Sequence, residues 1–224
     1  MKMPRKKRNA GFSIVELLIT MTIMLILLGI VSTVLSRAMG VRARESRKTD
    51  ALTSAEAALN VISREAASSG YGICTDSTCK TGSNGLITAD SDGSRIHFRT
   101  NLTNTGGTSL VPGPTAISTN QAGEDVTYFF DAATSSIVRY DPNDNPQTSV
   151  VVNKISNVTF QYFDYAGGGS AAAGPNSVPT ADTGRIRVIV SVTLDPVVGQ
   201  PNPASVTYRS DITLRNANYM LRQY

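Results

Sequence analysis

Hydrophobic residues follow two different patterns along this chain, one in the first third and one in the remainder. From Leu17 to Ser36 the sequence contains no charged residue, and most positions are apolar. This uncharged stretch of about 20 residues is long enough to cross a hydrocarbon core of ~30 Å as an α-helix. The sequence therefore predicts a transmembrane helix over residues 12–36.

The helix should continue beyond the apolar stretch, because no proline occurs between Phe12 and Tyr71. Five apolar residues then recur at spacings of three and four, which marks one face of an α-helix: Leu52, Ala55, Leu59, Ile62 and Ala66. Gly70 is available as a left-handed cap at the end of this segment. We expect one long helix over about 12–69, whose second half (37–70) packs this apolar face on a sheet.

After Gly72 the pattern changes to short segments rich in β-branched and aromatic residues, separated by turn clusters. The predicted strand segments are Arg95–Thr100, Asp125–Phe130, Ile137–Tyr140, Val150–Tyr165, Arg185–Leu194 and Ala204–Leu214. Imperfect alternation around Arg209–Asp211 suggests a β-bulge, and Gly167 to Pro179 indicates an exposed loop. The expected fold class is α+β, with the long N-terminal helix packed on an antiparallel β-sheet head over residues 71–224.

The positive charge of the chain is concentrated at its beginning. The formal net charge is +4, yet five basic residues without an acidic partner stand in residues 1–11: Lys2, Arg5, Lys6, Lys7 and Arg8. Without them, 16 basic residues remain against 17 acidic ones, a formal charge of −1. This arrangement predicts a basic leader with a cytoplasmic amino end and gives no basic face for nucleic acid.

An ordinary secretory signal peptide does not fit the order of these parts. In such a peptide the small-residue cleavage site follows a short apolar region. Here the small residue, Gly11, lies before the apolar stretch, which runs on into Arg37, Ala38 and Met39. Glu16 is a further departure, because a carboxylate at the edge of a membrane span carries a cost and indicates a function. The alternative for Glu16 is a side chain that reaches to water at the membrane edge.

The segment Gly11-Phe12-Ser13-Ile14-Val15-Glu16-Leu17-Leu18 resembles the prepilin motif of type IV pilin-like proteins. The resemblance covers residues 5–36 and implies that prepilin peptidase cuts after Gly11 and methylates the new amino group of Phe12. It also implies the pilin fold and a role for Glu16 in assembly, where its carboxylate pairs with a Phe12 amine. The mature protein would be a single-pass inner-membrane protein before assembly and part of a pilus or periplasmic filament afterwards.

The remainder of the chain is similar to PilW-like minor pilins and to the related J-type minor pseudopilin of type II secretion. Four passages carry this resemblance: Arg64–Gly72, Val158–Asp164, the Arg185–Leu194 strand and Thr213–Asn216. It implies a low-copy structural subunit that initiates pilus assembly at the filament tip. The implied partners are other minor and major pilins, the inner-membrane assembly platform and the membrane.

Candidate chemistry in the head is sparse. Cys74 and Cys79 lie on the exported side, where oxidation favours a disulfide, and the alternatives are free thiols or a metal site, for which only His97 adds a ligand. Alternation in Arg95–Arg99 places His97 on a solvent face. The sequences Asp90–Gly93 and Asp141–Asn145 favour turns over calcium sites.

The inventory of residues therefore favours a structural protein over an enzyme, and we expect no catalytic residue, cofactor or metal. The alternatives within filament biology are a minor pseudopilin of a type II secretion system and a pilus-borne adhesin or DNA-uptake subunit. A formal charge near −1 gives the mature chain no electrostatic attraction to DNA.

Overall fold

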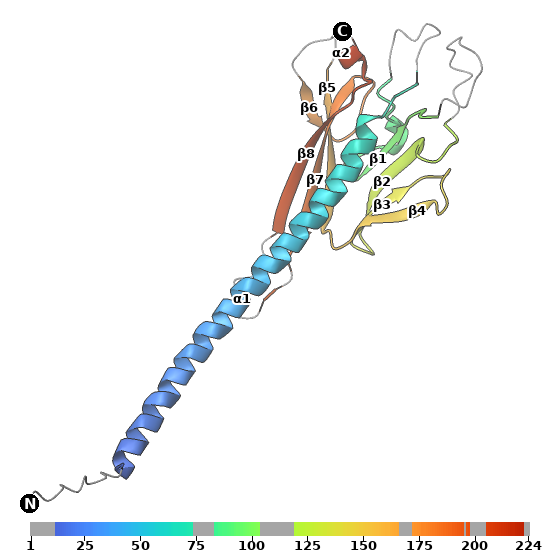
Figure 1. Cartoon of the computed structure of the whole chain (residues 1–224). Coiled ribbons are helices and arrows are strands. Elements are labelled where there is room, and N and C mark those ends of the chain that lie inside the picture. Colours follow the sequence, from blue (N-terminus) through green and yellow to red (C-terminus); the bar gives the residue numbers. More distant parts are fainter. Residues whose placement is uncertain are drawn as a thin grey trace, which may run out of the picture. The chain divides into compact units, whose positions relative to one another are not determined.

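The computed structural model describes residues 12–73, 83–103, 119–165, 172–194, 196–197 and 205–221. Its elements, shown in Figure 1, are α1 (Ile14–Ala67), η1 (Thr88–Asp90), β1 (Arg95–Arg99), β2 (Asp125–Asp131), β3 (Ser136–Tyr140), β4 (Thr148–Val152), β5 (Asn157–Asp164), β6 (Ala173–Asn176), β7 (Thr183–Thr193), β8 (Ser205–Thr213) and α2 (Asn218–Leu221). Their contacts define two units: residues 12–46 with 196–197, and the head, which comprises residues 47–194 and 205–221.

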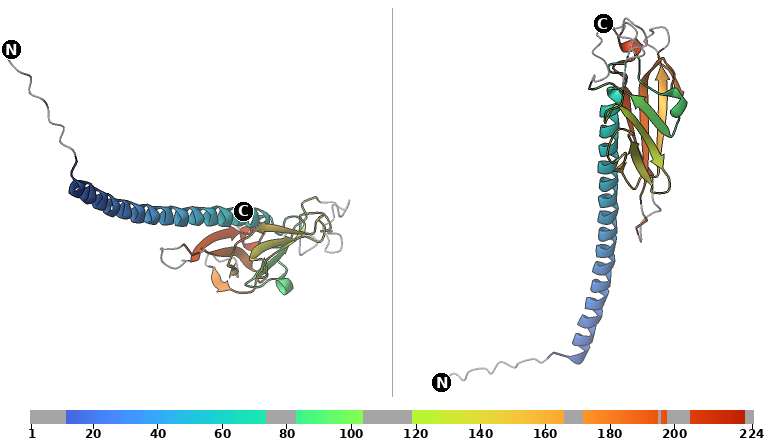
Figure 2. Two further views of the ribbon diagram at one scale, coloured as in Figure 1. Left: turned by 90° about the horizontal axis from the view of Figure 1, so that it is seen from below. Right: turned by 90° about the vertical axis from the view of Figure 1, so that its right-hand side faces the viewer.

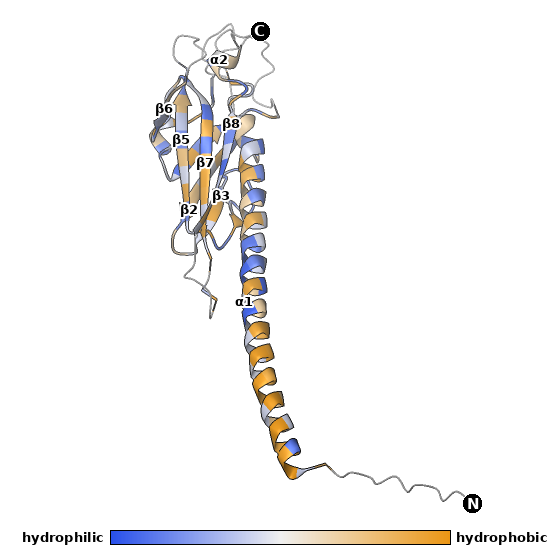
Figure 3. Cartoon of the chain, turned by 90° about the vertical axis from the view of Figure 1, so that its left-hand side faces the viewer, coloured by the Kyte–Doolittle hydropathy of each residue, from blue (hydrophilic) through white to orange (hydrophobic). Residues whose placement is uncertain are grey.

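Helix α1 runs from Ile14 to Ala67 without interruption, as the absence of proline predicts. Figure 3 shows that its residues change from mostly apolar in the amino-terminal half, apart from a hydrophilic position in the first turns, to a mixture of polar and apolar at the other end. In the head, α1 buries Ala55, Ala58, Leu59, Ile62 and Ala66. Four of these belong to the predicted stripe, and Leu52, the fifth residue of that stripe, is half-buried.

Gly70 turns the chain out of α1 in a left-handed conformation, with φ of 77°. A Cβ atom at this position would overlap the carbonyl oxygen of Ser83. The Gly70 N–H donates to the carbonyl of Arg99 over 2.9 Å, which ties the exit of the helix to the end of β1. The predicted left-handed glycine is therefore confirmed, and its lack of a side chain also permits the close approach of residue 83.

Within the described residues of the head, the strands form two antiparallel sheets, each with four strands. The first has the order β1-β2-β3-β4, and the second has the order β6-β5-β7-β8. Figure 2 shows both gathered against the second half of α1. Strand β5 of the second sheet is hydrogen-bonded to the start of β1 and the turn before it. The Phe160 N–H donates to the carbonyl of Gly93, and the Tyr162 hydroxyl donates to the carbonyls of Asp92 and Arg95.

A single hydrophobic core joins α1 to both sheets. Ile62 of α1, Tyr128 of β2 and Phe160 of β5 are each fully buried in it, and the rings of Phe98 and Tyr128 stack with centroids 6.1 Å apart. Alternating residues of β7, from Ile186 to Val192, point into the same core. The expected α+β architecture, with a long N-terminal helix on antiparallel sheets, is confirmed.

Three details differ from the sequence predictions. The predicted segment Val150–Tyr165 is two strands, β4 and β5, because Lys154 takes a positive φ of 61° between them. The expected bulge at Arg209–Asp211 is wrong, since β8 pairs with β7 in regular register from Ser205 to Thr213. Residues 173–176, expected in a loop, form the edge strand β6 beside β5.

Candidate functional site

The amino end of α1 places Phe12 and Glu16 in the first turns of the described chain. The Leu17 N–H donates to the Ser13 carbonyl over 3.1 Å, which starts the helix immediately after Phe12. Phe12 is 72% exposed, and Glu16 is also exposed. Negative charge in the first turn of a helix interacts favourably with its dipole. Helix α1 thus holds the Glu16 carboxylate close to Phe12, the residue whose amino group would be released by cleavage after Gly11.

The surface of α1 that follows is apolar on every side. Large hydrophobic side chains between Ile14 and Val41 are each at least 50% exposed within the chain. The hydroxyls of Thr20, Thr22 and Thr33 donate to carbonyls one turn earlier in the helix, which satisfies them without water. In the described part of the chain, α1 is the one helix long and apolar enough to cross a membrane. The surface as a whole suits lipid or neighbouring apolar helices.

Three of the predicted site residues lie outside the part of the chain that the structure describes. They are Gly11, before the proposed cut, and the two cysteines, Cys74 and Cys79. The cut, the methylation of Phe12 and the disulfide therefore remain predictions from the sequence.

His97 lies in a covered site, so the expected solvent-facing position is wrong. Its Nε2 is 2.6 Å from Oδ1 of Asp125, and its Nδ1 is 3.2 Å from Oδ2 of Asp90. Asp125 also accepts a hydrogen bond from Arg99 over 2.9 Å. Alternation had placed His97 on the correct side of β1, but η1 packs over that side. This cluster ties η1 to β1 and β2.

The two acidic turns serve as internal acceptors. The Asp92 carboxylate accepts hydrogen bonds from the N–H groups of Ser94 and Arg95 and from the Ser94 hydroxyl. These hydrogen bonds lower the pKa of Asp92, although burial acts in the opposite direction. Asp141 is fully buried and accepts the N–H groups of Gly123 and Asn143. The described residues contain no group of three or more His, Cys, Asp or Glu side chains placed to hold a metal ion.

A charged cluster that the sequence pattern did not reveal connects α1 to the first sheet. Oε2 of Glu65 accepts the Tyr128 hydroxyl over 2.7 Å and Nε of Arg139 over 3.1 Å. The same guanidinium reaches Asp141 over 3.1 Å and Asp144 over 3.4 Å. Burial, followed by the charge of Glu65, raises the pKa of Tyr128. Arg139 therefore neutralises acids from the helix and from the turn after β3.

Glu124 links Thr103 to Gln121, two residues that are 18 positions apart in the sequence. Its carboxylate is fully buried and accepts the N–H of Thr103 over 2.9 Å, the Thr103 hydroxyl over 2.7 Å and the N–H of Gln121 over 3.1 Å. Burial alone would raise the pKa of Glu124, but these donors together lower it below 4.5. The charged form is therefore favoured in the folded head.

We predict that acid destabilises the head partly through Glu124. A depressed pKa in the folded state adds stability above the unfolded value of about 4.5 and removes it as the pH falls through the folded value. The urea midpoint, followed by tyrosine near-ultraviolet circular dichroism of the full chain in detergent, should fall between about pH 5 and pH 3. Glu124→Gln should flatten this dependence, whereas Glu56→Gln, at an exposed position of α1, should leave it unchanged. An unaltered pH slope in Glu124→Gln would contradict the assignment.

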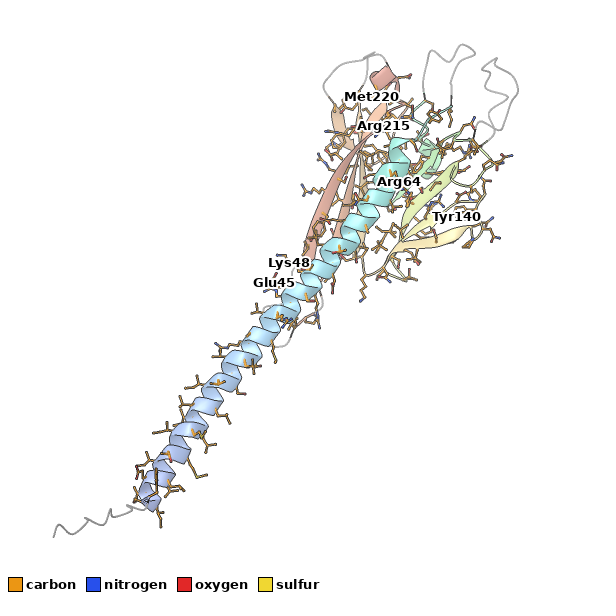
Figure 4. The ribbon with its side chains drawn as sticks, in the orientation of Figure 1. Glu45, Lys48, Arg64, Tyr140, Arg215 and Met220 are labelled. Carbon is orange, nitrogen blue, oxygen red and sulfur yellow. The ribbon has the colours of Figure 1, made fainter. Side chains whose placement is uncertain are left out.

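Two grooves border the head where α1 lies beside it. One, of about 610 Å³, lies between residues 47–54 of α1 and residues 153–156 and 192–194. The other, of about 1000 Å³, lies between residues 60–71, which include the end of α1, and the end of β8 with the residues that follow. Arg64, Arg215 and Met220, labelled in Figure 4, line this second groove.

Comparison with known proteins identifies one feature. Residues 6–32 match the family model of the prokaryotic N-terminal methylation motif. The chain matches none of the curated proteins and none of the solved structures with which it was compared. The matched range contains Phe12, Glu16 and the first part of the apolar surface of α1. Motif and architecture together support a type IV pilin-like protein, and the apolar helix is consistent with membrane anchoring.

Proposed function

We propose that this chain is a low-copy structural subunit of a type IV pilus, processed by prepilin peptidase, that takes part in initiating assembly at the filament tip. The observation that carries the proposal is the methylation motif at the start of an apolar helix whose second half is built into a β-rich head. The motif supports processing and assembly with other pilins in the membrane. The passages similar to PilW-like minor pilins support the minor role.

The mechanism follows from the two environments of α1. Before assembly, its apolar first half stays in the bilayer, because exposing it to water would carry a large hydrophobic cost. In a filament, the same surface exchanges lipid for the helices of neighbouring subunits. Glu16 then supplies a register, because a subunit placed at the wrong height leaves its carboxylate without a cationic partner.

Deletion of the gene tests the proposal. Surface pili should be lost or strongly reduced while type II secretion continues, and low-level expression of the wild-type chain should restore them. Quantitative immunoblots of sheared pili should find the chain far below the amount of the major pilin. Retained piliation with lost secretion would favour a minor pseudopilin instead. Normal piliation with lost adhesion or DNA uptake would favour a pilus-borne binding subunit.

A further inference from the structure

Strand β8 forms one edge of the second sheet and is nine residues long. The Leu214 N–H donates to the Gly184 carbonyl over 2.9 Å, and the pairing with β7 continues in register from that point. Hydrogen-bonded and non-hydrogen-bonded pairs alternate in an antiparallel ladder. The residues of β8 whose backbone N–H and C=O groups point away from β7 are therefore Ser205, Thr207, Arg209, Asp211 and Thr213. These outward groups have no hydrogen-bond partner in the part of the chain that the structure describes.

The open edge adjoins the groove beside α1. Asp211, Ile212 and Thr213 line this groove from β8, and residues 60–67 of α1 with the turn at 68–71 line it from the opposite side. Ser63 and Ser210, with side-chain oxygens 3.4 Å apart, lie where helix and strand come together. At ~1.5 Å per helical residue, the α1 wall from Asn60 to Ala67 is about 10 Å long, which matches about three residues of an extended chain. The groove thus has the dimensions of a short β-strand.

The groove also carries positive charge that the head does not neutralise. Arg64 of α1 and Arg215 after β8 are both exposed in its lining. Within the described residues neither has an ion-pair partner, whereas Arg139, Arg185 and Arg187 all do. Asp211, the acid in the lining, is bound by Arg187 through two contacts of 2.6 and 2.9 Å. Two arginine side chains therefore remain available for an anionic partner.

We propose that β8 and this groove bind an extended, acidic segment of another protein, which adds to the sheet as a further strand. The outward backbone groups of β8 would supply the main-chain hydrogen bonds, and Arg64 and Arg215 would select acidic side chains on the added strand. This inference rests on the proposed function only for the source of the segment, a neighbouring subunit of the filament.

Amide hydrogen exchange of the full chain in detergent micelles tests the pairing residue by residue. The probe is a short peptide of alternating valine and glutamate, and the control peptide has lysine in place of glutamate. Without peptide, the amides of Thr207, Arg209 and Asp211 should exchange fast, and those of Tyr208 and Ser210 slowly. The glutamate peptide should slow exchange at the outward amides by about tenfold or more, whereas the lysine peptide should not.

Two variants separate strand addition from simple charge attraction. Thr213→Pro removes an outward N–H that β7 does not use, and it should weaken binding of the glutamate peptide by about tenfold compared with Thr213→Ala. Combined Arg64→Glu and Arg215→Glu should abolish the preference for the glutamate peptide. Arg209→Glu, an exposed change in β8 that lies outside the groove lining, should preserve it. Slow exchange at Tyr208 verifies that each variant is folded.

Several outcomes would overturn the proposal. The first is no protection of the outward amides at saturating peptide, and the second is equal protection by the lysine peptide. Binding that is unchanged in Thr213→Pro would exclude strand addition. If the same amides became protected without peptide as the protein concentration rises, the partner would be a second copy of this chain and not an acidic segment of another protein. None of these outcomes depends on piliation, so failure here is distinguishable from failure of the proposed function.

Discussion

Replacing Glu16 by glutamine should reduce incorporation of the chain into filaments by more than about tenfold, while cleavage after Gly11 and membrane insertion continue. The proposed partner of Glu16 is the amine of a processed Phe12. At ~4 Å and an effective dielectric of about 20, two opposite charges attract by ~4 kcal/mol before desolvation is subtracted. About 1.4 kcal/mol of net attraction is enough for a tenfold change in incorporation. Glutamine keeps the size of the side chain and removes the charge.

The measurement compares the amount of each variant in sheared filaments with the amount remaining in the membrane. Glu56→Gln is the matched control, because it makes the same change at an exposed position of the same helix within the head. Glu16→Asp retains the charge with a shorter reach and should restore part of the incorporation. Wild-type incorporation of processed Glu16→Gln would exclude the pairing and favour a carboxylate that only reaches to water.

The long helix and most strands could be predicted because each depends on a local pattern. An uninterrupted apolar stretch, the 3-4 spacing up to Ala66 and the glycine at residue 70 together locate α1 and its exit. Strands such as β7 are recognisable because their alternating apolar residues are a direct consequence of one buried face. Strand β6 was missed because Ala173–Asn176 has no such alternation, and its pairing depends on the neighbouring β5.

The interactions that define the head's polar sites were beyond local patterns. Alternation identified the side of β1 on which His97 lies, but it carries no information that η1 would cover that side with Asp90. In the same way, Arg139 and Glu65 are 74 positions apart, so no spacing in the sequence relates them. Arg64 and Arg215 share a groove only because the end of α1 lies beside the end of β8, and the two residues are far apart in the sequence. Contacts of this kind can be predicted only once the fold is known, because they join residues that are far apart in the sequence.

Replacing Arg139 by methionine should destabilise the head by about 3–5 kcal/mol, the range found when one partner of a buried ion pair is removed. The side chain of Arg139 is 14% exposed, and that of Asp141 is fully buried. Methionine fills a similar space but leaves the carboxylates of Glu65, Asp141 and Asp144 without their shared cation. The expected cost therefore comes from uncompensated negative charge more than from lost packing.

Urea unfolding of the full chain in detergent, followed by tyrosine near-ultraviolet circular dichroism, measures this loss at neutral pH. Arg187→Met is the matched control, because Arg187 binds Asp211 at an exposed site of β7, where water screens the charges. Its midpoint should therefore stay close to that of the wild type. The urea midpoint of Arg139→Lys should lie between those of Arg139→Met and Arg187→Met. An ammonium group keeps the charge but cannot reach three carboxylates in the geometry of a planar guanidinium.

The same variant separates stability from the register function of α1. Arg139 acts within the head, where it fixes Glu65 of α1 to the first sheet, whereas Glu16 lies in the other unit of the chain. If the two act independently, Arg139→Met should lower the amount of folded protein in the membrane but leave the fraction of it that enters filaments unchanged. Equal losses of incorporation per folded molecule in Arg139→Met and Glu16→Gln would show that the head's attachment to α1 also governs assembly. Wild-type stability of Arg139→Met would contradict the role assigned to the cluster, because three carboxylates would then tolerate the loss of their common partner.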